Sequence, residues 1–195
     1  HYAEDVWDIE IKTKRFGWFE ICGVHDRKDY DLKRHGEFSK SKFTVGKETP
    51  GILEIAFGLE RPTYCLIEES LREEKVKGEK REWLSFPKGV APIDVAVFPL
   101  IKKGRMQKLA KQIFDELDNE FVCSFDQSGS IGRRYRRMDE VGTTLCITID
   151  HDSIKDKSVT IREISSMKQI RVKTDKLKEF IGGVLYEGKE FKKLK

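Results

Sequence analysis

The residues best suited to chemistry lie in the stretch 51–65, which reads GILEIAFGLERPTYC. An apolar, strand-like run ends at Gly58, and Arg61 follows at the start of an apolar helical segment. A guanidinium at a helix start can stack on an adenine ring and still donate hydrogen bonds. The order strand, glycine, arginine, helix therefore predicts a nucleotide-binding site that contains Arg61.

Two carboxylates stand inside apolar strand-like segments. Glu20 lies in GWFEICG, where strand alternation predicts that it shares a face with Trp18 and Cys22, and Glu54 has the same character in the next apolar strand. A carboxylate in such a place needs a partner. Two of them on neighbouring strands can hold a small cation such as an amino acid's ammonium group. The alternative is that they are two unrelated edge residues, each paired with a lysine.

A cluster of histidines and acids follows the second of these strands, with Asp31 and His35 at helical four-residue spacing. Two histidines and several acids in eleven residues suggest a metal site. Their spacing matches no known ligand set, which favours a polar network or a solvated face. None of the four cysteines forms a Cys-x-x-Cys pair, so we expect buried free thiols rather than a zinc site.

The segment 128–137, SGSIGRRYRR, combines glycines, a helix start, an aromatic residue and four arginines. These features suit a phosphate backbone with a stacked base. Arginines that bridge to Asp139 and Glu140 on an exposed helix face are an equally weighted alternative. The candidate RNA contacts are Arg133, Arg134, Arg136 and Arg137.

The chain has 195 residues and a formal charge of only +4, so its overall charge does not argue for nucleic acid. No apolar run approaches the roughly 18 residues that cross a bilayer. No secretory leader is visible, and the sequence favours a reducing cytoplasm.

The chain is expected to form two units, 1–86 and 87–195. A dense charge run at 72–82 and the proline-containing WLSFPKGVAP separate them. The first unit is predicted as an antiparallel α+β core. The second is predicted as an α/β domain with a mostly parallel five-stranded sheet. The expected strands are 6–12, 17–24, 51–58, 93–98, 121–125, 145–149, 159–162 and 169–172. The expected helices are 60–74, 105–119, 130–141 and 176–185, the last capped by Asp175, with a short helix or irregular segment at 29–39.

Together these pieces resemble glycyl-tRNA synthetases of the archaeal and eukaryotic type along nearly the whole chain. Residues 51–65 resemble the third class II motif, and SGSIGRRYRRMDEVG at 128–142 resembles the class IIa anticodon-binding domain. Trp7-Asp8, Gly17-Trp18 and Asp26-Arg27 match the segment that follows the family's second motif.

The resemblance implies roles for particular residues. Arg61, with Gly58, would bind ATP and stack on its adenine. Glu20, Glu54 and the position of Ala56 would bind glycine. The second unit would hold the anticodon stem-loop of tRNA-Gly, and the family's enzymes use Mg²⁺ and usually form homodimers.

The sequence also departs from the family's pattern. The first two class II motifs are absent, and Glu54-Ile55-Ala56 stands where the family has Glu-Pro-Ser. Gly46-Lys47-Glu48 replaces magnesium-binding acids, which leaves Glu48 as the candidate metal ligand. We therefore expect a glycine–tRNA ligase segment that is not active alone. The alternatives are a non-catalytic RNA-binding module or accessory subunit, and an α/β domain without an RNA role.

Overall fold

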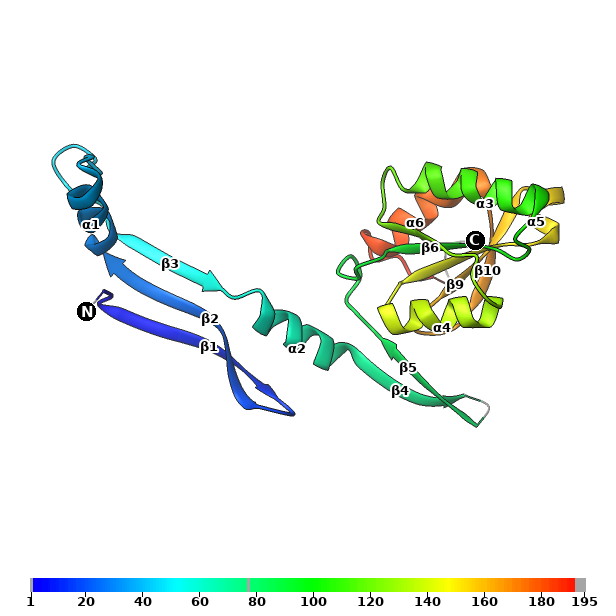
Figure 1. The fold of residues 1–195 in the computed structure, drawn as a ribbon, viewed down its shortest axis with the longest axis horizontal. Helices are drawn as coiled ribbons and strands as arrows, with labels where there is room; N and C mark the ends of the chain where they lie inside the picture. Colours follow the sequence, from blue (N-terminus) through cyan, green and yellow to red (C-terminus); the bar gives the residue numbers. More distant parts are fainter. Residues whose placement is uncertain (1, 77, 192–195) are drawn as a thin grey trace. The chain divides into compact units, whose positions relative to one another are not determined.

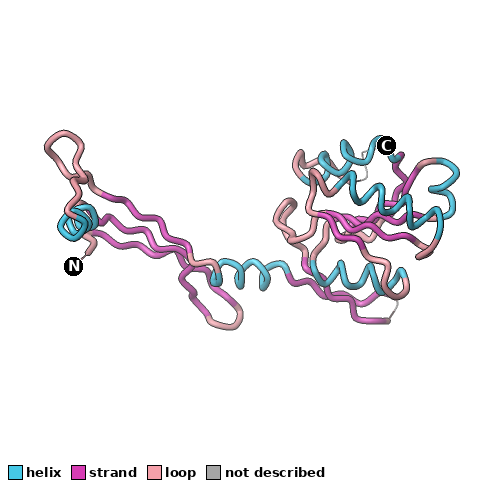
Figure 2. The backbone as a smooth tube through the Cα atoms, turned by 45° about the horizontal axis from the view of Figure 1, so that its top comes forward, coloured by secondary structure: helices cyan, strands magenta, loops and turns pink. Residues whose placement is uncertain are grey.

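The computed structural model describes residues 2–76 and 78–191, and the chain divides into two compact units. Unit 1 is His1–Glu69 and unit 2 is Ser70–Lys195. Figure 1 labels their elements and Figure 2 separates helices, strands and loops by colour. The division lies ahead of the boundary expected at 86–87, because the charge run at 72–82 folds as part of unit 2 instead of forming a linker.

Unit 1 is built on an antiparallel three-stranded sheet in the order β1-β2-β3. The three strands predicted in this region are confirmed, with β2 extending four residues beyond its predicted end. The predicted helix at 60–74 ends at Ser70, where the chain enters a further strand. The elements of the unit are β1 (Asp5–Thr13), β2 (Gly17–Lys28), α1 (Tyr30–Ser39), β3 (Ile52–Phe57) and α2 (Glu60–Ser70).

One face of this sheet is apolar and exposed. The apolar run of residues 51–58 would suit a buried strand, but Leu53, Ile55 and Phe57 are 77%, 67% and 64% exposed. They alternate with Glu54 and Ala56, so β3 presents an apolar face and a polar or small face.

Unit 2 contains a five-stranded sheet in the order β10-β9-β8-β6-β7. β6 is parallel to β7 and to β8, while β9 is antiparallel to both of its neighbours. Four of the five strands therefore run in the same direction, as predicted. They are β6 (Val95–Pro99), β7 (Cys123–Phe125), β8 (Leu145–Ile149), β9 (Ser158–Glu163) and β10 (Gln169–Lys173).

Helices cover both faces of this sheet (Figure 1). Strand alternation sends Val95 and Val97 to the core beneath α3 and α6, and Ala96 and Phe98 to a smaller core beneath α4. The helices are α3 (Gly104–Leu117), α4 (Ile131–Val141), α5 (His151–Asp156) and α6 (Leu177–Leu185).

Helix ends account for two differences from the sequence analysis. Asp175 does not cap the last helix: it lies in a 3-10 turn (Thr174–Lys176), and Lys176 precedes α6 without a side-chain cap. The short helix α5 was not predicted. It begins at Asp150 in a capping box with Ser153, a local signal too short to show helical periodicity. Near the end of the described residues, Phe191 is buried and its ring packs against that of Phe180.

A charged hairpin packs against α4 through a buried ionic network. The hairpin consists of β4 (Leu71–Val76) and β5 (Glu79–Leu84). Asp139 of α4 accepts hydrogen bonds from Arg81 at 2.9 Å and from Arg162 of β9 at 2.8 Å. All three side chains are at least 93% buried. Arg81 also bonds Glu74 and the Ile164 carbonyl, so its guanidinium joins the hairpin to the sheet.

The cysteines are free thiols, as expected. Cys22, Cys65 and Cys146 are buried and Cys123 is half-buried. Burial raises the pKa of Cys146 to about 12, which leaves it unreactive at neutral pH. Among the described residues, no helix is long and apolar enough to traverse a lipid bilayer.

The network around Asp139 makes a first prediction. Asp139→Asn should lower the free energy of unfolding by about 3 kcal/mol, because it removes the counter-charge of the buried Arg162 guanidinium and leaves the buried Arg81 with Glu74 alone. Urea denaturation would measure the loss. Glu140→Gln, at the exposed neighbouring position, should change stability by less than about 0.5 kcal/mol. Equal effects of the two substitutions would contradict this account.

A second prediction concerns pH. Burial raises the pKa of Asp150, but hydrogen bonds from Arg171 and Ser153 outweigh burial and lower it to about 2. A depressed carboxyl pKa stabilises the fold above the unfolded value of 3.8, and the contribution disappears as the pH falls toward 2. Asp150→Asn, which keeps the helix cap, should cost about 1 kcal/mol at pH 7 after solvent screening. Unfolding curves of the two proteins should converge below pH 4; a constant gap would refute the assignment.

Candidate functional site

The centre of the candidate site in unit 1 is an ion pair between Arg61 and Glu20. The Arg61 Nη1 atom lies 2.9 Å from the Glu20 carboxylate and 3.1 Å from its backbone carbonyl oxygen. The guanidinium carbon also stands 5.4 Å from the centre of the Phe19 ring. Both charged side chains are about half exposed, so the pair contributes little to stability but leaves the guanidinium accessible to a ligand.

A β-bulge determines which residues share this site. Ile9 pairs with Cys22 and Glu10 pairs with Glu20, so Ile21 is an extra residue on β2. The bulge reverses the strand's alternation, and the prediction that Glu20 and Cys22 share a face is therefore wrong.

The bulge brings Glu20 to the face that carries Ala56. Glu20, Ala56, Gly58 and Arg61 line one pocket of about 240 Å³, together with Ile21, Gly23 and His25. Four residues that the sequence analysis selected are thus brought together. Ala56 stands opposite Gly23 on the adjacent strand, which leaves the wall of the pocket without a bulky side chain.

Glu54 does not line that pocket. It pairs across the sheet with His25, and its carboxylate lies 2.7 Å from Arg27 and 3.9 Å from the His25 ring. Arg27 in turn bonds Asp31 at 2.6 Å, and this bond is the main reason that the pKa of Asp31 is lowered. Asp31 therefore belongs to the polar network that the sequence favoured over a metal site.

Sequence reasoning missed the roles of Arg27 and His25. The tripeptide His25-Asp26-Arg27 was visible, but only strand pairing shows that two of its side chains meet Glu54. That register cannot be read from composition.

The candidate metal ligand Glu48 stands in a turn, where its backbone pairs with Val45. Among the described residues, no group of three or more His, Cys, Asp or Glu side chains is arranged to hold a metal ion. The donor set that an all-protein magnesium site would need is not present there, and we assign no chemical step to the ion.

The four arginines of α4 have different surroundings. Arg134 is only 2% exposed; it donates hydrogen bonds to the carbonyl oxygens of Pro99 at 2.6 Å and Gly129 at 2.9 Å. Burial lowers its pKa, and among the described residues its Nε finds no hydrogen-bond partner. Arg134 thus fastens the end of β6 to the start of α4, and this position is not available to an external ligand.

The remaining three arginines are accessible to different degrees. Arg137 bonds Asp126 and the Ser128 carbonyl, while Arg136 bonds the Lys80 carbonyl and lies 3.5 Å from Glu79. Arg133 is exposed.

Arg136 and Arg162 also line a pocket of about 370 Å³ between α4 and the hairpin, together with Tyr135. The Tyr135 ring faces the Arg162 guanidinium at 4.8 Å and its hydroxyl contacts Thr148.

The fold is similar to that of class II aminoacyl-tRNA synthetases, and in unit 2 to their anticodon-binding domain. Residues 94–183 match the family described as "Anticodon binding domain". Prolyl-tRNA synthetase of Giardia lamblia, solved with prolyl-adenylate, superposes on 90% of this chain and 36% of its own, with a TM-score of 0.64 and 14% identity. The RNA binding domain of threonyl-tRNA synthetase from Cryptosporidium parvum covers 90% of this chain and 42% of its own, with a TM-score of 0.63 and 18% identity.

Curated relatives make the similarity more specific. The chain is 42% identical to the glycine–tRNA ligase of Treponema denticola over 99% of its own length and 45% of the relative. It is 41% identical to that of Bacillus cereus, over 93% of this chain and 40% of the relative. The glycine–tRNA ligase of the archaeon Methanothrix thermoacetophila is 33% identical, over 93% of this chain and 45% of the relative. The chain thus spans less than half the length of these relatives, which are bacterial as well as archaeal.

The contrast between the α4 arginines gives a third prediction. Arg134→Met should lower the free energy of unfolding by about 3 kcal/mol, because the buried Pro99 carbonyl and the partly buried Gly129 carbonyl lose their donor. Arg133→Met, one residue earlier on the exposed side, is the matched control and should change it by less than about 0.5 kcal/mol. Thermal or urea unfolding distinguishes them, and a larger loss at Arg133 would reverse the assignment.

Proposed function

We propose that this chain is part of a glycine–tRNA ligase that uses ATP to activate glycine and transfers it to tRNA-Gly. The pocket around Arg61 and Glu20 is the observation that carries the proposal. Ala56, Gly58 and Arg61, which line the pocket, belong to the segment that resembles the third class II motif. The identity of about 42% to a ligase of this name, over nearly the whole chain, supports the same function.

Unit 1 would contribute to binding ATP and glycine. The Arg61 guanidinium has one side near the Phe19 ring and is half exposed, a setting that suits stacking on adenine. Glu20 offers a carboxylate to the glycine ammonium, and Glu54 would join it only when its partner Arg27 moves aside. Ala56 leaves space for a small amino acid.

The chemistry assigned to these residues is positioning and charge neutralisation. Amino-acid activation is an attack of the glycine carboxylate on the α-phosphate of ATP, which breaks the bond to the bridging oxygen and releases pyrophosphate, and it needs no protein nucleophile. The residues of unit 1 would hold the two reactants in line and orient the adenine end of ATP. Mg²⁺ neutralises phosphate charge in such reactions, but the residues that the structure describes supply no donor set to which we assign it.

Unit 2 would bind the anticodon stem-loop. The exposed Arg133 and the half-exposed Arg136 and Arg137 are the members of the arginine cluster that can contact RNA, whereas Arg134 cannot without unfolding its surroundings. We also propose that the protein forms a homodimer and is located in the cytoplasm.

A non-catalytic RNA-binding module is the second candidate. Ala56 favours it, because the residue stands in the pocket where the family has a serine whose hydroxyl contacts glycine. Binding of tRNA without glycine-dependent exchange would select this alternative. Absence of tRNA binding would remove both readings and leave an α/β domain without an RNA role.

The fourth prediction tests activation. In the complete protein that contains this chain, Arg61→Ala should reduce glycine-dependent ATP–pyrophosphate exchange by roughly a hundredfold or more, because the adenine loses its stacking and orienting group. Arg34→Ala, at an exposed arginine of α1 paired with Glu37, should leave the rate within about twofold. Unchanged exchange in the Arg61 variant would overturn the assigned role.

A further inference from the structure

A second cavity of unit 2 lies away from the arginine cluster of α4. Its volume is about 580 Å³, and we call it the α3–α5 pocket. It is lined by Ile101, Lys103, Arg105, Met106, His151, Ile154 and Lys155. These residues belong to the loops and helix starts that follow β6 and β8, two parallel neighbouring strands. The carboxyl ends of parallel strands are where open α/β sheets bind their ligands.

The lining of this pocket is cationic. It contains Lys103, Arg105, Lys155 and the ionisable His151, and no carboxylate. Within residues 2–76 and 78–191, neither lysine nor the arginine takes part in an ion pair. Two acids flank His151: Asp150, whose carboxylate bonds Arg171 and Ser153, and the exposed Asp152, which does not line the pocket. The arginines of α4, by contrast, are largely buried or paired.

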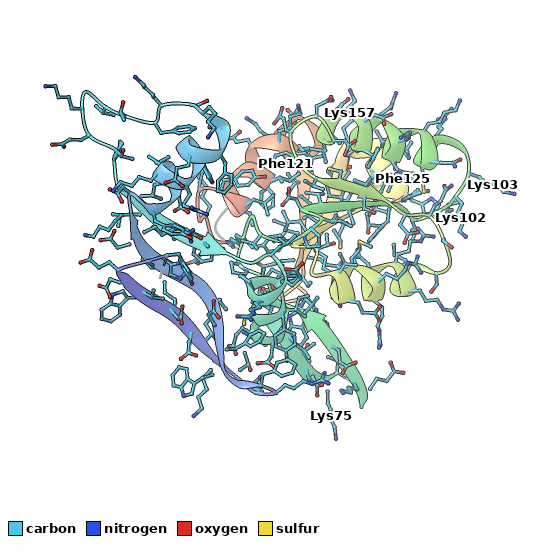
Figure 3. All side chains as sticks on the ribbon, turned by 60° about the vertical axis from the view of Figure 1, so that its left-hand side comes forward. Lys75, Lys102, Lys103, Phe121, Phe125 and Lys157 are labelled. Carbon is cyan, nitrogen blue, oxygen red and sulfur yellow. The ribbon has the colours of Figure 1, made fainter. Side chains whose placement is uncertain are left out.

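The helix start reinforces this charge. α3 has 14 residues, and Lys103 precedes it without a side-chain cap. Its first turn contains no acidic residue. The positive end of the helix dipole therefore adds to the lysine and arginine charges at the pocket and favours an anion. Figure 3 shows Lys102 and Lys103 on the loop that leads into α3, with their side chains pointing away from the sheet.

The floor of the pocket is apolar. Met106 is buried and Ile154 half-buried, while Ile101 is 44% exposed. A cationic rim above an apolar floor suits an unpaired nucleotide, whose phosphate needs positive charge and whose base needs an apolar surface. A duplex offers its phosphates but keeps its bases stacked inside.

We propose that the α3–α5 pocket binds the phosphate and base of an unpaired nucleotide in the RNA that unit 2 recognises. The inference rests on the proposed RNA-binding function and adds a contact surface to it. Lys103, Arg105 and Lys155 contact the phosphate, and Ile101 and Ile154 support the base.

The test compares two triple variants of this 195-residue chain in fluorescence-anisotropy titrations with labelled tRNA-Gly transcript. The pocket variant is Lys103→Ala, Arg105→Ala, Lys155→Ala. The control is Lys176→Ala, Lys178→Ala, Lys189→Ala, which removes the same charge from lysines paired with Glu179, Glu120 and Glu187. The pocket variant should lose at least about tenfold in affinity and lower the slope of log K against log salt by about 2, as expected for three lost phosphate contacts on a single strand. The control should stay within about threefold.

The outcomes separate the two claims. No tRNA binding by the unsubstituted chain overturns the proposed RNA role itself. Binding with equal affinity and salt slope in both triple variants overturns only the pocket. The three substituted side chains are exposed, so the unfolding midpoints of the variant and the unsubstituted chain should match. If the triple variant is unstable, Arg105→Gln alone replaces it, with an expected loss of about threefold in tRNA affinity.

Competition experiments identify the ligand's form. An anticodon-loop hairpin should displace labelled tRNA from the unsubstituted chain better than a fully paired RNA of equal length. Equal competition by the duplex overturns the unpaired-nucleotide assignment. A third outcome is that inorganic phosphate binds the unsubstituted chain but not the pocket variant, while the two proteins bind tRNA with equal affinity. This result would show a site for free phosphate and overturn the RNA assignment.

Discussion

The buried carboxylate of Asp139 is the constraint on which the arrangement of unit 2 depends. A charge removed from water must be paired, and Asp139 is paired twice, by Arg81 and Arg162. Because these partners come from β5 and β9, the ion cluster joins the hairpin, α4 and the antiparallel side of the sheet. The apolar cores beneath the helices supply most of the driving force for folding, but they do not specify where a charged hairpin packs.

This constraint also explains why the RRYRR segment is difficult to interpret from sequence. An α-helix sends successive residues to different faces, so Arg133 and Arg134 meet solvent and protein respectively although they are neighbours. The sequence could show that α4 is a helix and that Gly142 follows it. It could not show that the Arg134 guanidinium donates hydrogen bonds to two backbone carbonyl groups, because one of them belongs to Pro99, which is distant in the chain. The alternative that the α4 arginines bridge to Asp139 on an exposed face is wrong for this residue, because Asp139 is buried and its partners Arg81 and Arg162 lie on other elements.

Regular strands and long amphipathic helices were predictable because apolar alternation and helical periodicity are local properties. The strands of the five-stranded sheet of unit 2 and α3 are examples. The charge run at 72–82 was misread because a solvent-facing hairpin has few apolar residues to reveal it, and its anchoring residue Arg81 is itself charged. In unit 1, four residues singled out from the sequence, Glu20, Ala56, Gly58 and Arg61, line one pocket, and their roles stay predictions. The separation of Glu54 from that group depends on cross-strand pairing, which no local pattern encodes.

The extra residue Ile21 has a consequence for how this site can vary among related sequences. Its removal would restore regular pairing between β1 and β2 and rotate Glu20 to the opposite side of the sheet from Ala56, while leaving every catalytic candidate in the sequence. Insertions and deletions between residues 18 and 23 should therefore be far less tolerated than replacement of Ile21 by another amino acid. An alignment that places a gap there would compare side chains with opposite orientations.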